Sequence, residues 1–393
     1  MEKISDQGRL RPWMGFVLFT VFMLFFIFIC SPLEINLGTV GLVITELSFL
    51  AIAVVYCLIR KVKIKEVFPI KKVKVREVIG CILLVLGAFP LSIISVAITA
   101  IIFPASTKEV SELSSFIYGS MSYPVAILIV ALLPAICEEA IHRGAILSNF
   151  RSIKHDWIIV LVMGLLFGIN HMSVLRFGAT MILGIVLSYV VVKKNNILLS
   201  MFMHFTNNLI SLSLGYLSGQ TGGVEVAAVD YKMALGTYLL IGFAGPILIT
   251  LGLMLLRPES HKKIRFLYAG ILATVMFIAG IGVTYANAAK STLVNSTISY
   301  EVTLEDKDCV IGEFDVEESR SAAVAAIITN AGQGYTIRID GDSGSNIINS
   351  EVPEGAMRMI TYNVELEPDH YTVTLVPDEN AVGEHPIVQI RIQ

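Results

Sequence analysis

Ionisable side chains interrupt three neighbouring apolar segments of this sequence. They are Glu138, Glu139 and Arg143 near the end of one apolar run, His171 at the close of the next, and His204 and Asn208 on one face of a later run. A charged group inside a membrane helix is costly, so such residues usually face a bundle interior or a water-filled cavity. The sequence therefore predicts a polar site buried in a membrane protein.

Two carboxylates, two imidazoles, an amide and a guanidinium suit hydrolysis. A carboxylate takes a proton from water while imidazole or amide groups stabilise the oxyanion that forms. Glutamate and histidine also hold a catalytic divalent metal, here most plausibly zinc, and leave one position open for water. Taken one at a time, the same residues would be a structural ion pair and packing histidines. Their coincidence on three segments indicates a functional site, and physics alone leaves hydrolysis and transport both open.

The helix period predicts how the groups of the first segment are arranged. Glu139 and Arg143 are four residues apart, so they lie on one face and are expected to pair. Glu138 is turned by about 100° and shares its face with His142, which we expect to be interfacial. Pro134 lacks a backbone N–H and is expected to kink the helix one turn earlier, which opens space for water.

The other two segments bring their polar groups to the ends of helical faces. Gly164 and Gly168 form a small-xxx-small pair that permits close helix approach, and His171 lies beside that strip. His204 and Asn208, four residues apart, share one face. By our span boundaries His171 falls at the outer end of a short helix, whereas His204 falls in the inner half of its own. The helix that carries His171 is therefore expected to begin deep or to return toward the same level.

The composition is that of a polytopic membrane protein. Of 393 residues, 55% are hydrophobic and 16% charged, with a mean hydropathy of +0.74. We expect an all-α bundle of eight or nine transmembrane helices in residues 1–290. The spans are predicted near 14–30, 38–59, 78–103, 124–147, 157–171, 177–192, 197–214, 236–256 and 266–287.

Basic residues orient the predicted spans. Lysine and arginine gather before the first span, in 60–76, and again near 151–154, 193–194 and 257–265, whereas the alternate loops hold few. Nine helices with a cytoplasmic N-terminus satisfy the positive-inside rule and leave the C-terminus outside. This pattern predicts a multi-pass protein of the cell membrane, most simply a bacterial one. No feature indicates nucleic-acid binding.

Residues 291–393 form a separate acidic domain. They hold 18 acidic and 5 basic residues, a net charge of −13, against +10 for residues 1–290. Alternating apolar and polar residues recur at 298–304, 335–339, 371–375 and 387–392, separated by turn sequences. We predict a small extracytoplasmic β-sandwich of roughly seven strands. It is either a stable tethered domain or a module that recruits an unknown ligand.

Three ordered motifs carry a family resemblance. Glu138-Glu139-x-x-x-Arg143, Phe167-x-x-x-His171 and His204-x-x-x-Asn208 resemble the motifs of the CAAX protease and bacteriocin-processing (CPBP, or Abi) family. This family includes the type II CAAX prenyl endopeptidases, and the resemblance covers roughly residues 80–215. It implies an intramembrane endopeptidase that hydrolyses a membrane-associated peptide or protein within the lipid bilayer.

The resemblance also implies roles for the carboxylates and the guanidinium. Glu138 and Glu139 would be catalytic residues or metal ligands, and Arg143 would orient them. The family is described both as metalloproteases and as glutamate-dependent proteases, and no HExxH sequence decides between these here. We expect Glu139 to be the general base, because its face also carries Arg143.

The remaining roles follow from the other two motifs. By the same resemblance, His171 and His204 would bind the metal or activate water, and Asn208 would polarise the scissile carbonyl. Two other functions stay open. One is a transporter or metal carrier that uses the same groups, although no inverted repeat supports it. The other is a non-catalytic scaffold whose working part is the acidic domain.

Overall fold

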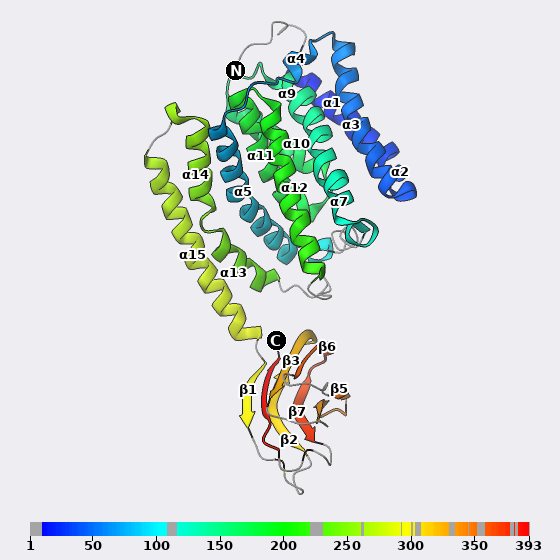
Figure 1. The fold of residues 1–393 in the computed structure, drawn as a ribbon, viewed down its shortest axis with the longest axis vertical. Helices are drawn as coiled ribbons and strands as arrows, with labels where there is room; N and C mark the ends of the chain where they lie inside the picture. Colours follow the sequence, from blue (N-terminus) through cyan, green and yellow to red (C-terminus); the bar gives the residue numbers. More distant parts are fainter. Residues whose placement is uncertain are drawn as a thin grey trace. The chain divides into compact units, whose positions relative to one another are not determined.

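The chain divides into two compact units in the computed structural model (Figure 1). We call Met1–Thr284 the membrane unit and Tyr285–Gln393 the C-terminal unit. The structure describes residues 10–107, 116–220, 231–260, 263–291, 293–299, 302, 308–329, 335–344, 346–351, 358–377, 381 and 384–392.

Long apolar helices make up the first part of the membrane unit, and one sharp turn reverses the chain between two of them. Gly38 lies between α2 and α3 with φ of 54° and ψ of −126°, a conformation that side chains disfavour. The elements of this part are α1 (Pro12–Phe25), a π-helical segment (Phe26–Cys30), α2 (Ser31–Leu37), α3 (Thr39–Arg60), α4 (Ile64–Val67), α5 (Val75–Ile102) and a 3₁₀ turn (Pro104–Ser106).

One span, Tyr123–Phe150, carries the glutamates and departs twice from regular α-helix. Its successive parts are α7 (Tyr123–Ala126), a π segment (Ile127–Leu132), α8 (Leu133–Glu139), a second π segment (Ala140–Ile146) and α9 (Leu147–Phe150). Pro134 lies in the first turn of α8, directly after the first π segment, where its missing N–H is tolerated. Such wide turns occur often at functional sites.

Helices α10 (Asp156–Asn170) and α11 (Val174–Lys194) pack closely because glycines face each other. A Cβ on Gly164 would lie 2.5 Å from Ile185 Cγ1, and one on Gly184 would lie 3.0 Å from Gly164 Cα. No side chain fits in this space. The predicted close approach at the Gly164 face is therefore confirmed.

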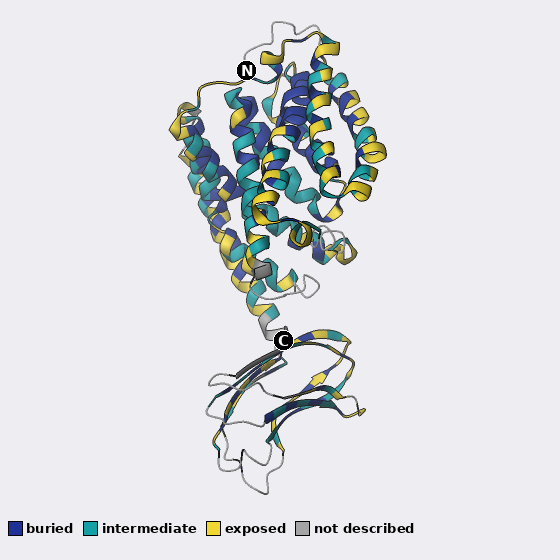
Figure 2. Ribbon diagram, turned by 45° about the vertical axis from the view of Figure 1, so that its right-hand side comes forward, coloured by how far each residue is buried: buried dark blue, intermediate teal, exposed yellow. Residues whose placement is uncertain are grey.

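Four helices and a 3₁₀ turn complete the membrane unit, and the first three of these helices pack against α5. They are α12 (Ile197–Gln220), α13 (Tyr231–Gly242), α14 (Gly245–Leu256), a 3₁₀ turn (Pro258–Ser260) and α15 (Ile264–Ser291). Helix α5 contacts α11, α12, α13 and α14. Figure 2 shows the buried residues gathered between these helices, where Leu84, Phe167 and Leu187 belong to one apolar cluster.

The described residues contain seven helices that are long and apolar enough to cross a membrane, or up to eight if one bent pair is a single span. The prediction of eight or nine is slightly too high. Helix α10, predicted as 157–171, has only 15 residues and is about 22 Å long, short of a hydrocarbon core of about 30 Å. The predicted span 236–256 is the bent pair, because α13 and α14 meet at 41°.

The C-terminal unit is a sandwich of two four-stranded antiparallel sheets. Its sheets have the orders β1-β8-β3-β6 and β2-β7-β4-β5. The strands are β1 (Val294–Ser299), β2 (Cys309–Val316), β3 (Arg320–Thr329), β4 (Tyr335–Gly341), β5 (Asn346–Glu351), β6 (Arg358–Leu366), β7 (Asp369–Pro377) and β8 (Ile387–Ile392).

Alternation along the strands fills the space between the sheets. In β4, for example, Tyr335, Ile337 and Ile339 are buried while the residues between them are not. The predicted all-β domain is therefore confirmed, and its described residues form eight strands against the roughly seven predicted. The strand predicted at 298–304 overlaps only the end of β1, and most of its remaining residues lie outside the described part of the chain.

Candidate active site

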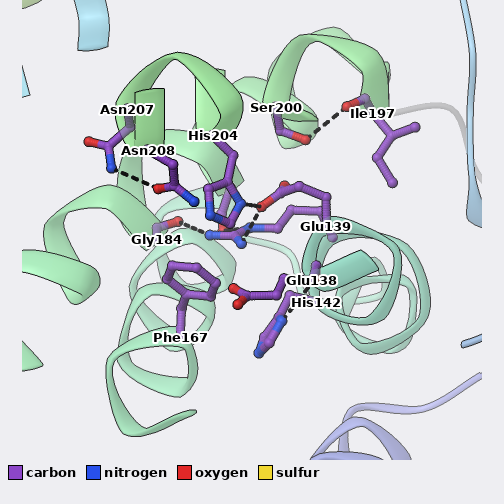
Figure 3. A network of polar contacts seen from close by, with 12 residues as sticks. Glu138, Glu139, His142, Phe167, Gly184, Ile197, Ser200, His204, Asn207 and Asn208 are labelled. Atoms are coloured by element: carbon purple, nitrogen blue, oxygen red, sulfur yellow. Dashed lines mark hydrogen bonds and ion pairs between the residues drawn. The ribbon is translucent and has the colours of Figure 1, made fainter. Parts of the chain in front are cut away.

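Three elements bring the predicted polar side chains together (Figure 3). Helix α8 and the π segment after it carry Glu138, Glu139 and Arg143, and α12 carries His204. The end of α10 carries His171 as its C-cap residue. The last turn of α10 lies beside the π segment and α12, because Phe167 in that turn contacts His142 and His204.

Glu139 forms the centre of a buried ion-pair network. Its Oε1 atom accepts a hydrogen bond from Arg143 Nη1 at 2.6 Å and another from His204 Nδ1 at 3.0 Å. The side chains of Glu139 and Arg143 have no exposed surface, and that of His204 is 3% exposed. The predicted pairing of Glu139 with Arg143 is therefore present, and His204 joins it.

Arg143 ties this network to α11. Its Nε donates to Ser188 Oγ at 3.4 Å, and its Nη2 donates to the Gly184 carbonyl at 3.3 Å. The guanidinium carbon also lies 4.2 Å from the centroid of the Phe167 ring, a cation–π contact. The charge of Arg143 is thus met by a carboxylate, two polar oxygens and a ring face, as a buried charge requires.

Phe167 is the common neighbour of the histidines. Its ring centroid lies 5.1 Å from that of His142, 4.9 Å from that of His171 and 5.7 Å from that of His204, each edge to face. These contacts show that His171 and His204 both lie against Phe167. The two histidines are therefore close together, although the predicted span boundaries placed them at different depths.

Backbone carbonyls fix the hydrogen positions on two of the imidazoles. His142 Nδ1 lies 3.0 Å from the Glu138 carbonyl oxygen, and His171 Nδ1 lies 2.9 Å from that of Phe167. A carbonyl only accepts, so Nδ1 carries the hydrogen, and the Nε2 of a neutral ring keeps a lone pair. His142 is fully buried, so its predicted interfacial position is wrong. The apolar side chains of Phe22 and Phe167 enclose it.

Glu138 differs from its neighbour in every contact. Its side chain is only partly buried, and it forms no ion pair or hydrogen bond within the described ranges. Its Oε2 atom is buried without a hydrogen-bond partner. Of the two carboxylates in Figure 3, only that of Glu139 carries dashed contacts. The Oε2 atom of Glu139 is also buried without a partner, so Glu138 differs from Glu139 in having neither a cation nor an imidazole on its carboxylate.

Asn208 lies one turn beyond His204 but takes no part in the Glu139 network. Its Nδ2 donates to the Val130 carbonyl at 3.3 Å, and its Oδ1 accepts from Asn207 Nδ2 at 3.2 Å. Its predicted role toward a substrate carbonyl would require the amide to leave Val130. The amide therefore links α12 to the π segment that precedes α8.

The arrangement does not fit the predicted metal site of Glu138, Glu139, His171 and His204. Glu139 Oε1 already accepts hydrogen bonds from a guanidinium and an imidazole, which compete with any cation. Across the residues that the structure describes, no group of three or more His, Cys, Asp or Glu side chains is placed to hold one ion.

Sequence reasoning missed Ser188, His142 and Glu46 as neighbours of the site. Ser188 contacts Arg143, and Glu46 lies on α3, a helix that packs against α8 and the π segment after it. Glu46 had the same signal as the glutamates of α8, because it is a carboxylate inside an apolar span. Ser188 had no such signal, since serine is tolerated in apolar helices.

Comparison with known proteins gives one family. Residues 120–210 match the family described as "Type II CAAX prenyl endopeptidase Rce1-like". This segment covers about a quarter of the chain and contains all six predicted site residues. A search of curated proteins finds no match.

Two solved structures are similar in outline. One is the pre-peptidase C-terminal domain of collagenase from Bacillus anthracis, with 17% identity, 25% of this chain and 90% of that chain covered, and a TM-score of 0.21. The other is a carbohydrate binding module (CBM6cm-2) from Cellvibrio mixtus lichenase 5A in complex with cellotriose, with 15% identity, coverages of 27% and 92%, and a TM-score of 0.18.

Proposed function

We propose that the membrane unit is an intramembrane endopeptidase, a proposal supported by the match of residues 120–210 to the Rce1-like family of type II CAAX prenyl endopeptidases. It hydrolyses a peptide bond of a membrane-associated protein or peptide. The observation that carries the proposal is the difference in contacts between the two adjacent carboxylates. Arg143 and His204 hold Glu139 through its Oε1, whereas no ion pair or hydrogen bond holds the carboxylate of Glu138 within the described residues, although each glutamate keeps a buried Oε2 without a partner.

In this proposal Glu138 is the general base and Glu139 supports the site. The expectation from sequence, that Glu139 is the base, rested on its face shared with Arg143. The contacts favour the opposite assignment, because the guanidinium and the imidazole on Oε1 stabilise the ionised form of Glu139 and make it the weaker base. Glu138 has no such partner in the described residues, and a base must be within reach of water.

His171 assists by holding the water. Its Nδ1 donates to the Phe167 carbonyl, so its Nε2 lone pair is available to accept a hydrogen bond from water. As the water oxygen bonds to the substrate carbonyl carbon, Glu138 takes one proton from it. The carbon–nitrogen bond then breaks and the same proton passes to the leaving nitrogen. Asn208 is proposed to polarise the carbonyl once its amide turns from Val130.

The location and partners are also proposals. The run of apolar helices supports a multi-pass protein whose substrate reaches the site through the lipid bilayer. The distribution of lysine and arginine favours a cytoplasmic N-terminus and an extracytoplasmic C-terminal unit, most simply in a bacterial cell membrane. The acidic C-terminal unit is proposed to recruit a ligand or to remain as a tethered domain.

The test is peptide cleavage by the purified full chain in liposomes. We expect the wild type to cleave members of a membrane-peptide library, and Glu138→Gln and His171→Ala each to lower kcat at least about a hundredfold. His155→Ala, outside the network, is the matched control and should cleave normally. A chelator should leave the cleavage rate unchanged. Loss of cleavage on adding a chelator would instead support the predicted metal site. Absence of cleavage by wild type throughout the library would contradict the proposal.

Transport is the second candidate, because α13 and α14 form a bent pair of the kind that lines transporter sites. The pair lies outside the segment that matches the family. Uptake of substrate into vesicles that depends on Glu138, without any cleavage, would favour transport over hydrolysis. An isolated C-terminal unit that rescues a deletion strain would instead favour the scaffold.

A further inference from the structure

The short stretch of chain between α3 and α5 is strongly basic. Residues 61–76, which we call the basic segment, hold seven lysine and arginine residues against one glutamate, a net charge of +6. All seven basic residues are exposed, and they are Lys61, Lys63, Lys65, Lys71, Lys72, Lys74 and Arg76. The positive-inside rule accounts for basic residues in such a loop, but it requires neither a fixed structure nor exposed apolar side chains beside the charges.

Apolar side chains are interleaved with these charges. Ile64, Ile70 and Val75 have 46%, 68% and 77% of their surface exposed, and each is next to a lysine in the sequence. Exposed basic and apolar side chains on one segment are the combination by which interfacial segments enter the boundary between lipid headgroups and acyl chains. The basic segment therefore has the side chains of a lipid contact.

Buried residues fix the first half of the basic segment to the helical bundle. Val62 and Val67 are buried in one apolar cluster with Leu10 and Cys57. The ring of the next residue, Phe68, fills the space beside Gly144, where a Cβ would overlap it. These contacts hold α4 against the bundle and leave its lysines on the outside.

Hydrogen bonds fasten the second half to the turn between α11 and α12. The Ile197 N–H donates to the Pro69 carbonyl at 2.9 Å. Asn196 Nδ2 donates to the Lys71 carbonyl at 3.0 Å, and its Oδ1 accepts from the Lys71 N–H at 3.3 Å. The charges of the basic segment thus stand on an ordered backbone, which lowers the entropy cost of binding a partner.

The acidic side chains beside the basic segment do not balance its charge. Glu66 lies 3.5 Å from Lys63 Nζ. Glu77, directly after the segment, lies 2.5 Å from the Nζ of Lys194 on α11. One glutamate within the segment and one that is paired with a lysine of another helix leave a large positive surplus, which suits an anionic partner.

The position of the basic segment selects the kind of anion. The helices on either side of it, α3 and α5, are both candidate membrane spans. The segment joins their ends, so it lies at a membrane surface, where the phosphates of anionic lipids attract clusters of basic residues. The acyl chains directly beneath those phosphates would cover the exposed side chains of Ile64, Ile70 and Val75.

We propose that the basic segment is a binding surface for anionic phospholipids. Its lysine and arginine side chains contact the headgroup phosphates, and Ile64, Ile70 and Val75 lie against the upper part of the acyl chains. The proposal goes beyond peptide hydrolysis and does not depend on it, since lipid binding is measured without any peptide substrate.

The first test measures lipid binding by the purified full chain in a neutral detergent. Phosphatidylglycerol and phosphatidylcholine with identical acyl chains are titrated in turn, and bound lipids are counted by native mass spectrometry. We expect phosphatidylglycerol to bind at least about tenfold more tightly at low salt, and this preference to shrink as the salt concentration rises. Equal affinity for the two lipids would overturn the proposal.

The second test asks whether the basic segment is the binding surface. A triple variant, Lys65→Gln, Lys72→Gln and Arg76→Gln, should bind phosphatidylglycerol about a hundredfold more weakly, because each basic residue near an anionic surface contributes about fivefold. The matched control removes the same charge from exposed positions of later loops and helices, by Lys232→Gln, Lys263→Gln and Arg265→Gln. The control should bind almost as wild type does, and an equal loss in both triple variants would overturn the proposal.

Two further measurements distinguish a lipid from other anions. Ile70→Ser combined with Val75→Ser keeps every charge and should weaken phosphatidylglycerol binding several-fold, because apolar contact with the acyl chains is lost. Its unfolding midpoint in neutral detergent should equal that of wild type, since both side chains are exposed. Unchanged lipid affinity in this variant would contradict the proposal. Complete displacement of phosphatidylglycerol from wild type by inorganic phosphate or by polyglutamate would assign the surface to a soluble anion or to an acidic protein.

Discussion

The chain contains a histidine–carboxylate pair in each of its two units, and the two pairs differ in their surroundings. In the membrane unit, His204 Nδ1 lies 3.0 Å from Glu139, and both side chains are at most 3% exposed. In the C-terminal unit, His370 Nδ1 lies 2.7 Å from Asp315, with side chains 39% and 80% exposed. The shorter hydrogen bond is the more exposed one, so the distance alone does not show which pair contributes more to stability.

Burial decides what each pair contributes. Water and salt screen the His370–Asp315 pair, and exposed pairs of this kind contribute little to stability. The buried pair has no water to replace a lost partner, and its second cation, Arg143, has no exposed surface. Removing one member of the buried pair leaves an uncompensated charge. A histidine–carboxylate pair is therefore essential to the stability of the membrane unit but adds little to that of the C-terminal unit.

The largest expected effect is the loss of the buried cation. Arg143→Ala should lower the free energy of unfolding of the membrane unit by about 3–5 kcal/mol, because Glu139 is left buried beside a single imidazole. The measurement is thermal or denaturant unfolding in detergent. Lys193→Ala is the matched control, since Lys193 also lies 2.6 Å from a carboxylate, that of Asp156, but both side chains are partly exposed. Equal losses in the two variants would contradict the role given to burial.

A smaller effect is expected from the helix spacing that positions the buried pair. Gly164→Val should destabilise the membrane unit by about 1–3 kcal/mol, because its side chain would overlap Ile185. The shift of α11 should also disturb the carbonyl of Gly184, which accepts from Arg143. Gly270→Val in α15 has open space and serves as the control. Unchanged unfolding in Gly164→Val, measured in the same assay, would show that the spacing is adjustable.

The smallest effect belongs to the exposed pair and is visible as pH dependence. The hydrogen bond to Asp315 raises the pKa of His370 above its ordinary value. A raised pKa in the folded state contributes stability that is fully present below the unfolded pKa, about 6.5, and is lost as pH rises through the folded pKa. Asp315→Asn should lower the pKa of His370 in an NMR titration of the full chain and remove this contribution. Glu318→Gln removes an equal exposed charge and is the control, which should leave the pKa of His370 nearly unchanged. A pKa shift in Glu318→Gln as large as that in Asp315→Asn would contradict a specific role for the His370–Asp315 pair.

Much of the site follows from the sequence because the spacing of its residues fixes helix faces. The four-residue interval predicted the contact between Glu139 and Arg143, which the structure contains. The apolar spans and the alternating tail predicted a helical bundle followed by a β-sandwich. These features depend on local periodicity, which a single sequence displays directly.

What the sequence did not predict depends on contacts between distant segments. Burial of His142 requires Phe22 from α1 and Phe167 from α10 to enclose it. The choice between Glu138 and Glu139 as base depends on His204, which is 65 residues away along the chain. The π segment Ala140–Ile146 also departs from the 3.6-residue period on which the face assignments were based.

The central claim is that Glu138, and not Glu139, takes the proton from water. The most direct measurement compares Glu138→Gln with Glu139→Gln for both cleavage rate and unfolding midpoint in the same liposome or detergent preparation. We predict that Glu138→Gln abolishes cleavage and keeps a wild-type midpoint, whereas Glu139→Gln lowers the midpoint because Arg143 loses its carboxylate. A Glu138→Gln variant that cleaves at the wild-type rate would contradict the account.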